Sequence, residues 1–593
     1  MSTRLVVAMA TALLATASSV HAQAVAAPPA WVARSNADAQ VLLDALARFN
    51  PEFASQVGIA GYDDKVADLK PGIDARSRAA LLDAKAQLEK MLATERDADV
   101  QQDLHIMINA AGQQVEGIDL NAKYLLPFQD IGQLVFGGEF SLLKDGVDAK
   151  RHPAALARLQ CYIGKAPGCT PITQLAEAQT TERLGNKALL GPYKGQVDQQ
   201  LDNTSHYVDG LRQLYAKNKL DSAEAKAALD TLAQQLKDYD SWVRSTVLAH
   251  ARTDFRMPEP LYAYTLKQVG VDIPPQELMK QAELEFVEMR GAMQMMAPVV
   301  AKAEGIDATG YQAVFQALKK QQLPKDQVMP WYHDVLSKIE ATIRREHIVT
   351  LPDRPMQMRL ASDAENAQIP APHMDPAPFI NNHGEQGTFV LSTGHPAKKG
   401  DNSQSYDDFT YQAAAWTLTS HEGRPGHELQ FSAMIEHGVS LARSLFAFNS
   451  VNVEGWALYS ESEMLPYEPP AGQFAALQAR LMRAARAFLD PMLNLGLISK
   501  ERAKDVLIHD VGLSEPMARE EIDRYTFNSP GQATAYFYGY MRIQQLRLET
   551  ELTLGPKFDR MAFNDFLIGQ GLLPPAQLAE AVRTQFIPAQ QKR

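Results

Sequence analysis

The chain has 593 residues, of which 46% are hydrophobic and 22% charged, and its 58 basic and 70 acidic residues give a net charge of −12. This composition is typical of a globular protein and excludes a disordered, collagenous or disulfide-dense chain. An acidic chain of this kind lacks the basic surface that nucleic acids require, so we predict no nucleic-acid partner.

Residues 1–22 have the pattern of a secretory signal peptide. Arg4 supplies a short positive region, an apolar stretch runs from Leu5 to Val20, and Val20-His21-Ala22 matches a small-x-Ala cleavage site. The alternative is an uncleaved membrane anchor, but the stretch is short for a membrane span. We therefore expect cleavage after Ala22, no membrane span in the mature chain, and a periplasmic or secreted protein.

The chain has two cysteines, Cys161 and Cys169, on either side of a loop that contains Gly and Pro. In an oxidising compartment this local pair predicts a disulfide, and the alternative is two free thiols. Two cysteines alone cannot form a zinc site.

Most of the chain has the apolar spacing of α-helices. From about Asn36 to His347, apolar residues recur three and four apart, between residues that favour helices. Six prolines between Pro352 and Pro378 exclude a helix interior and indicate a covering loop or a domain junction. Residues 387–393, with sequence GTFVLST, predict a short strand, and the helical pattern resumes from Phe409. These patterns predict a mostly α protein with one small sheet.

A dense group of metal-type ligands lies in TSHEGRPGHELQ, residues 419–430, with His421, Glu422 and His427. Zinc takes imidazole and carboxylate ligands, and hydrolytic zinc sites add a nearby Glu as general base. The two histidines are six residues apart, not four as in HExxH, so on a regular helix they would point about 120° apart. The Gly-Arg-Pro-Gly segment between them can break the helix and fold the second His back. The alternative is that both are loop histidines.

A second cluster, NVEGWALYSE at residues 452–461, has the pattern of a helix start. Glu454 lies 27 residues after His427, a spacing at which zinc peptidases with two His ligands and one Glu ligand place that Glu on the next major helix. Glu461 is seven residues further, nearly on the same helix face, and is predicted to orient a His ligand. The alternative for Glu454 is a solvated helix charge.

Three segments together resemble a known family. They are HEGRPGHELQ from His421, EGWALYSE from Glu454, and a stretch from Arg524 to Tyr536 that contains RY, PGQA and a final Tyr. Together they resemble the bacterial family named domain of unknown function 885. Members of that family look like zincin metallopeptidases, similar in outline to the thimet oligopeptidase and angiotensin-converting enzyme groups. The resemblance implies a mostly α fold, a large helical zincin-like shell around a deep cleft, with one small β-sheet.

The proline-rich stretch separates two regions. Residues 23–350 form an N-terminal helical region, and residues 351–593 form a C-terminal catalytic region with the metal motif. Both regions are expected to form one cleft. In the family, a helix downstream ends in Asp-x-Gly-x-His, whereas Asn494 stands here at the place of that His. If that His polarises the substrate in relatives, its replacement lowers the rate or changes the specificity.

These residues and the resemblance predict an exported zinc metallopeptidase that hydrolyses peptide bonds of oligopeptides. His421, His427 and Glu454 are expected to bind Zn²⁺ and to leave a coordination position open for water. Glu422 would take the proton from that water as general base and pass it to the leaving amine.

Further side chains are expected to bind the substrate or support the site. Tyr536, with Tyr538 as second choice, would donate a hydrogen bond to the oxyanion of the transition state. Gln532 would bind the substrate backbone, and Arg524 is predicted to support the site or to bind the substrate. The strand at residues 387–393 would pair with an extended peptide, and the alternative is an ordinary edge strand.

Two other functions remain open. The first is a metal-dependent hydrolase that acts on amide or ester bonds outside peptides. The second is a non-catalytic helical binding protein of the cell envelope with a vestigial metal site. The sequence contains no Gly-x-Ser-x-Gly, Gly-x-Gly-x-x-Gly or P-loop pattern, so a serine hydrolase and nucleotide chemistry are disfavoured.

The mature protein should begin at or near Gln23, because the charged, apolar and cleavage regions of a signal peptide end at Ala22. The intact mass of protein purified from the envelope fraction measures this directly. A mass that retains residues 1–22 would contradict the prediction.

Overall fold

The computed structural model describes residues 29–392 and 406–592, so the predicted signal peptide at residues 1–22 lies outside the described part. Helices dominate this part, together with one sheet of three strands. The prediction of a mostly α fold with one small β-sheet is confirmed.

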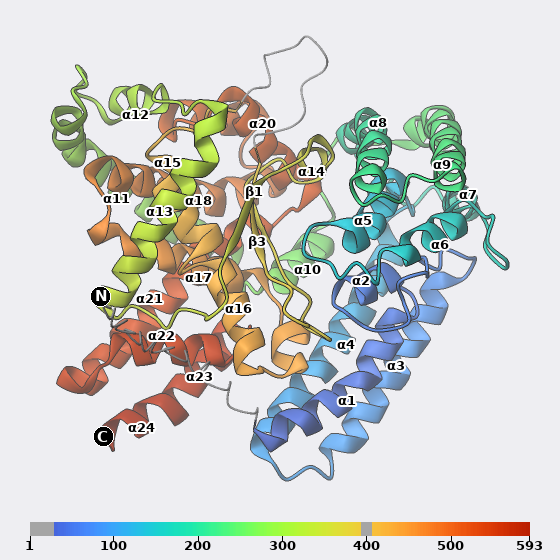
Figure 1. The fold of residues 1–593 in the computed structure, drawn as a ribbon, viewed down its shortest axis with the longest axis horizontal. Helices are drawn as coiled ribbons and strands as arrows, with labels where there is room; N and C mark the ends of the chain where they lie inside the picture. The colour runs from blue at the N-terminus through green and yellow to red at the C-terminus, as the bar shows by residue number, and fades with distance from the viewer. Residues whose placement is uncertain (1–28, 393–405, 593) are drawn as a thin grey trace, which may run out of the picture.

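The first helices form the right half of the molecule in Figure 1, in blue to green. They are α1 (Ala30–Ala47), α2 (Pro51–Gln56), α3 (Ile73–Leu92), α4 (Ala98–Tyr124), α5 (Ile131–Leu143), α6 (Pro153–Tyr162), α7 (Ile172–Arg183), α8 (Lys194–Lys217) and α9 (Ala223–Trp242), followed by the turns η1 (Val243–Val247) and η2 (Leu248–His250).

The later helices, in green to red, form the left half, with α10 between the halves. They are α10 (Glu259–Val269), α11 (Pro275–Glu304), α12 (Tyr311–Lys319), α13 (Lys325–Glu346), α14 (Asp363–Gln368, beside the sheet), α15 (Ala414–Leu418), α16 (His427–His437), α17 (Ser450–Met464), α18 (Pro470–Asn494), α19 (Lys500–Asp505), α20 (Glu515–Asp523), α21 (Ala535–Leu554), α22 (Arg560–Gly569), α23 (Pro575–Ala581) and α24 (Ile587–Gln591). Short π- and 3₁₀-helical turns join them: η3 (Thr419–Gly423), η4 (Ala442–Phe446), η5 (Leu465–Tyr467), η6 (Val506–Asp510), η7 (Arg524–Asn528), η8 (Gln532–Thr534), η9 (Gly555–Lys557) and η10 (Val582–Phe586).

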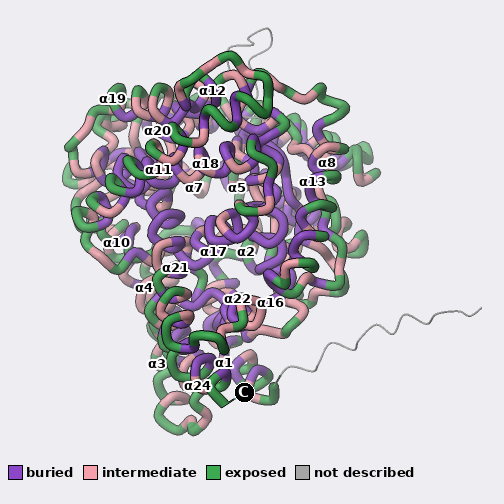
Figure 2. The backbone as a smooth tube through the Cα atoms, turned by 90° about the vertical axis from the view of Figure 1, so that its left-hand side faces the viewer, coloured by how far each residue is buried: buried purple, intermediate pink, exposed green. Residues whose placement is uncertain are grey.

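Within the described residues, the interior divides into three hydrophobic clusters, and Figure 2 shows the buried segments gathered inside the exposed turns. The largest cluster joins α10–α13 to α15–α24. A second lies among α5–α9 and α14, and a third among α1, α3 and α4. Helices α10–α13 come before residue 350 and helices α15–α24 come after it, yet both groups contribute to the largest cluster. Residue 350 therefore does not separate two hydrophobic cores.

The small sheet has the strand order β1-β3-β2. β1 (Gln357–Leu360) is parallel to β3 (Thr388–Leu391), with Met358 opposite Phe389, and β2 (His373–Asp375) is antiparallel to β3, with Met374 opposite the same Phe389. The predicted strand at residues 387–393 therefore exists, but its expected role at an open edge is wrong. β3 is the central strand, and its backbone groups pair with a strand on each side. The strands β1 and β2 could not be predicted from the sequence, because both are short and lie among prolines.

Cys161 at the end of α6 forms a disulfide with Cys169, with their Cα atoms 5.2 Å apart. The predicted local pairing is confirmed. The bond closes the loop that leads into α7.

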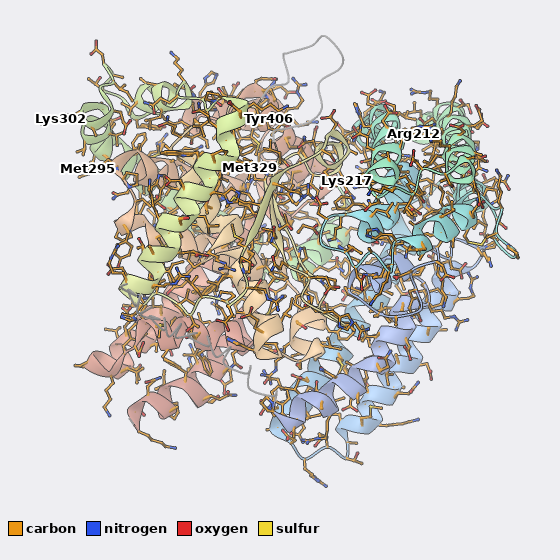
Figure 3. All side chains as sticks on the ribbon, in the orientation of Figure 1. Arg212, Lys217, Met295, Lys302, Met329 and Tyr406 are labelled. Atoms are coloured by element: carbon orange, nitrogen blue, oxygen red, sulfur yellow. A yellow bond between two sulfur atoms is a disulfide. The ribbon has the colours of Figure 1, made fainter. Side chains whose placement is uncertain are left out.

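The described surface carries a few large apolar side chains, as is normal for globular proteins. The most exposed is Met295 on α11, at 83%, which Figure 3 labels at the outer edge of the molecule. In the described ranges, no helix has both the length and the apolar character needed to cross a membrane.

Helices α17 and α21 approach each other with their backbones in contact. A Cβ atom added to Gly539 would lie 1.9 Å from the carbonyl oxygen of Val451, and one added to Gly455 would lie 2.5 Å from the carbonyl carbon of Gly539. No side chain fits into this crossing, so both positions require glycine.

Gly539→Ala should lower the midpoint of thermal unfolding, because overpacking of this kind costs typically about 1–3 kcal/mol. Gly291→Ala on α11 is the matched control, since a Cβ atom there meets nothing within 4 Å. Replacing an exposed helical Gly by Ala should raise the midpoint, by up to about 1 kcal/mol of stability. Equal effects of the two substitutions would refute the crowded crossing.

Candidate metal centre and active site

The segment between the two histidines breaks the helix. His421 lies in the π-helical turn η3, which ends at Gly423, and α16 begins at His427. A Cβ atom on Gly426 would lie 1.9 Å from the carbonyl oxygen of His421, so the chain folds back onto its own previous turn. This return brings the imidazole rings together, with ring centroids 4.8 Å apart.

Side chains from three directions hold this turn. Arg424 is buried and donates through Nε to Glu428 Oε2 at 2.7 Å and through Nη1 to Glu340 Oε1 at 2.7 Å. From α17, Trp456 Nε1 and Ser460 Oγ donate to the carbonyl oxygen of Pro425, at 3.0 and 3.2 Å. The turn is therefore fixed to the helix that carries Glu454.

His421, His427 and Glu454 each offer one ligand atom to a common point, and these atoms lie within 4.8 Å of one another. Glu454 Oε2 is 3.5 Å from His421 Nε2 and 3.3 Å from His427 Nε2. Burial raises the pKa of Glu454, but its contacts with both imidazoles outweigh burial and hold the pKa well below its ordinary value.

The two distances from Glu454 Oε2 to the imidazole nitrogens are close to the edge of a zinc coordination tetrahedron. Zinc bonds to N and O ligands of roughly 2.0–2.1 Å place neighbouring tetrahedral ligands roughly 3.3–3.4 Å apart. Glu454 Oε2 is also buried and has no hydrogen-bond partner among the described residues. A buried carboxylate oxygen needs a partner, and a cation bound between the three side chains would supply one.

Glu461 fixes the orientation of His421. Its Oε1 lies 2.7 Å from His421 Nδ1, Thr417 Oγ1 donates to its Oε2 at 2.5 Å, and Arg483 Nη2 donates to Oε1 at 3.2 Å. Burial raises the pKa of Glu461, but Arg483 and the hydrogen bond with His421 lower it below its ordinary value. An ionised Glu461 accepts a hydrogen bond from Nδ1–H, and Nε2 is then the unprotonated nitrogen that faces Glu454.

Glu422 lies beside this cluster, is 8% exposed, and lines a cavity. Burial raises its pKa to about 7, with an opposing effect of His427 and a further increase from Glu454. Glu422 follows His421 on η3 and lines the same cavity as His427 and Glu454.

Tyr536 closes the other side of the cluster, with its ring stacked on that of His421 at 5.9 Å between centroids. Arg524 Nη2 donates to the phenol oxygen at 2.8 Å, which leaves the phenol proton free to donate into the cavity. Gln532 donates through Nε2 to Glu454 Oε1 at 3.2 Å and accepts through Oε1 from Arg524 Nε at 3.1 Å. Both ends of the Gln532 amide thus have protein partners, so the structure makes Gln532 a support for Glu454.

Two residues considered from the sequence lie outside the cluster. Tyr538 donates its hydroxyl to Asp272, because positions two apart on a helix point to different faces. Asn494 donates to the carbonyl oxygens of Asp490 and Tyr525, both at 3.0 Å, and so joins α18 to η7. The structure therefore does not place either side chain where it could contact a substrate at the metal cluster.

The cluster opens into a cavity of about 700 Å³. Glu422, His427, Glu454 and Tyr536 line one side, and the edge strand β2 contributes His373 and Met374. The opposite side comes from α5, α8 and the residues just before α5. The cavity therefore lies between the two halves of the molecule in Figure 1.

Sequence reasoning missed the opposite side of this cavity. Five carboxamide side chains line it, and we call them the amide wall: Gln133 of α5 and Gln196, Gln199, Gln200 and Asn203 of α8. The four on α8 follow the spacing i, i+3, i+4, i+7, which places them on one helix face. That regular spacing was the available signal, but a polar stripe is also the ordinary pattern of a solvated helix face.

Comparison with known proteins places the chain in a family. A family model described as "Bacterial protein of unknown function (DUF885)" matches residues 51–582. The chain belongs to this family, as its motifs predicted. No curated protein matches the chain.

Two solved structures share the fold. The putative lipoprotein from Colwellia psychrerythraea is 18% identical, with a TM-score of 0.76 over 94% of this chain and 99% of its own. A putative lipoprotein of unknown function from Shewanella oneidensis is 18% identical, with a TM-score of 0.70 over 93% of this chain and 99% of its own. At this identity the likeness establishes the fold.

Glu521→Gln should destabilise the protein. Glu521 accepts from Arg486 Nη2 at 2.5 Å and from Arg486 Nε at 2.7 Å, and Arg486 lies 4.6 Å from the ring centre of Tyr536. Both charges are buried, so loss of one partner should cost about 3–5 kcal/mol. Glu515→Gln on the same helix removes exposed ion pairs and should cost no more than about 1 kcal/mol.

The pair of Glu521 and Arg486 also makes the stability of the folded protein depend on pH. Burial raises the pKa of Glu521, but Arg486 outweighs it and lowers the pKa to about 2 from an ordinary value of 4.5. A lowered pKa means that this stabilisation is present above about pH 4.5 and is lost as the pH falls toward 2. Thermal unfolding followed across this range should show a shallower acid limb in Glu521→Gln than in the wild type, and equal slopes would refute the assignment.

Proposed function

We propose that this chain is an exported zinc-dependent metallopeptidase that cleaves oligopeptides. The observation that carries the proposal is the cluster of His421, His427 and Glu454, whose ligand atoms lie within 4.8 Å of one another beside a cavity that His427 and Glu454 line. Zinc in such a site activates water for attack on a carbonyl carbon and polarises that carbonyl.

The chain supplies the remaining chemistry. The Glu422 carboxylate would accept the proton of the attacking water and deliver it to the amine of the leaving product. Tyr536, whose oxygen already accepts from Arg524, would donate its own proton to the oxygen of the attacked carbonyl. Such a donor, oriented before the reaction, stabilises the charge that develops in the transition state.

An extended peptide would lie along β2. This strand is at the edge of the sheet, and His373 and Met374 line the cavity that contains Glu422. Main-chain pairing along a sheet edge binds peptides of many sequences. The prolines on both sides of β2 limit this pairing to a few residues, since proline has no N–H donor.

The metal ligands can be tested through His427→Ala. One of three protein ligands would be lost, so zinc content after dialysis should fall from one ion per chain to near zero, and peptidase activity should disappear. His437→Ala is the control, because His437 is exposed at the far end of the same helix α16. Full zinc occupancy in His427→Ala would show that the two histidines are not a ligand pair.

Glu422→Gln separates chemistry from metal binding. The variant keeps the shape of the side chain and removes the base, so zinc content and peptide affinity should stay unchanged. Turnover should fall by roughly 10²–10⁴-fold, the typical contribution of a general base. Zinc content, peptide affinity and turnover are measured on the same preparation.

The outcomes distinguish the candidate functions. Unchanged turnover in Glu422→Gln would refute the proposed mechanism, and loss of zinc would make Glu422 a ligand. Stoichiometric zinc in a wild-type protein that cleaves esters or other amides, but no peptide, would instead identify a non-peptide hydrolase. Peptide binding without any turnover would identify a binding protein.

A further inference from the structure

The amide wall faces the metal cluster across the cavity. Its helix α8 belongs to the hydrophobic cluster that α5–α9 build, whereas the metal ligands belong to the largest cluster. The wall lines the same cavity of about 700 Å³ as Glu422 and Tyr536. A substrate held at the metal cluster would therefore extend toward α8.

One member of the wall lacks a partner. Gln200 is 5% exposed, lines the cavity, and its Oε1 is buried without a hydrogen bond among the described residues. The neighbouring Asn203 is held in place, since its Nδ2 donates to the carbonyl oxygen of Ala367 at 3.1 Å. Buried carboxamide oxygens in native proteins nearly always have a donor, so an unpaired one on a side chain that lines a cavity marks a side chain available to a ligand donor.

The amide wall has no positively charged group that could pair with a negatively charged substrate side chain. Among the described residues that α5, α8 and the segment before α5 contribute to the cavity, none is Lys or Arg, and the acidic member is Asp130. Asp130 Oδ1 accepts from the backbone N–H of Gln133 and caps α5. A negatively charged substrate side chain would lose water here without gaining a counter-charge, which is costly.

We propose that the amide wall is a specificity subsite for uncharged polar side chains of the peptide, namely Asn, Gln, Ser and Thr. Each of these carries an N–H or O–H donor for Gln200 Oε1, and each also accepts from the amide groups of the neighbouring side chains. An apolar side chain would leave the amides unpaired, and a negatively charged one would be buried without a partner. The substrate class rests on the proposed peptidase function, but the recognition itself is a property of the wall.

The test compares Gln200→Met with the wild type. Met has nearly the shape of Gln, favours helices and forms no strong hydrogen bond. Gln213→Met is the matched control, because Gln213 lies further along α8, outside the cavity, between Arg212 and Lys217, which Figure 3 labels. Zinc content and the thermal midpoint of both variants establish that each is folded and loaded.

A positional peptide library first identifies the residue position whose side chain governs binding to zinc-loaded Glu422→Gln protein. Peptides that carry Gln, Leu, Lys or Glu at that position are then compared by kcat/KM. The wild type and Gln213→Met should prefer Gln over Leu by about tenfold, the scale of one buried neutral hydrogen bond. Gln200→Met should lose this preference, because the Met side chain offers no acceptor to the Gln peptide and leaves no amide unpaired beside the Leu peptide. A preference that survives in Gln200→Met, or a wild type that prefers Lys or Glu, would overturn the proposal.

Binding separates this proposal from the peptidase proposal. The affinities of the Gln and Leu peptides are measured with zinc-loaded Glu422→Gln protein, alone and combined with Gln200→Met. A Gln preference that requires Gln200 supports the amide wall even when the wild type cleaves no peptide, a result that would refute only the peptidase. Equal affinities for both peptides, or no binding of either, would overturn the amide wall.

Discussion

The contact between Gly455 and Gly539 is the constraint on which the site depends. Two helices can bring their backbones together only where neither carries a side chain, and here α17 and α21 meet in this way. Glu454 precedes one glycine in the chain, and Tyr536 lies one turn before the other. The crossing therefore brings a candidate metal ligand and a candidate oxyanion donor next to the same imidazole, that of His421.

Several residues of α17 between Glu454 and Glu461 each make a different contact with the cluster. Glu454 faces the two imidazoles, Gly455 makes the crossing, and Glu461 orients His421. Trp456 and Ser460 both hold the carbonyl oxygen of the turn between the histidines. This explains why the segment reads as a motif: a substitution at any of these positions would disturb a different contact of the same cluster.

Buried ion pairs support this arrangement. Arg483 pairs with Glu461 behind His421, and Arg486 pairs with Glu521 behind Tyr536. Buried pairs contribute little net stability, because desolvation offsets their attraction. Their effect here is positional, since a charged partner in a fixed place holds an imidazole or a phenol in one orientation.

Sequence patterns were sufficient where the contacts are local. Helical periodicity predicted the fold class, and the glycine and proline between His421 and His427 predicted the broken helix. Contacts between distant parts of the chain could not be predicted from the sequence. Such contacts place the strand at residues 388–391 in the centre of the sheet instead of at its edge. They also turn Tyr538 away from the cavity, although both tyrosines follow the same motif. The amide wall was missed because a polar stripe looks the same whether it faces water or a cavity.

The amide wall on α8 and the metal cluster belong to different hydrophobic cores. Substitutions on the two sides of the cavity can therefore be accepted independently. Residues on α8 can be exchanged without altering the packing around the imidazole pair, while the glycine crossing tolerates almost no change. Substitutions on α8 would then change what the cavity accepts and leave the candidate metal cluster in place. A family built in this way would be expected to share a mechanism more widely than a substrate.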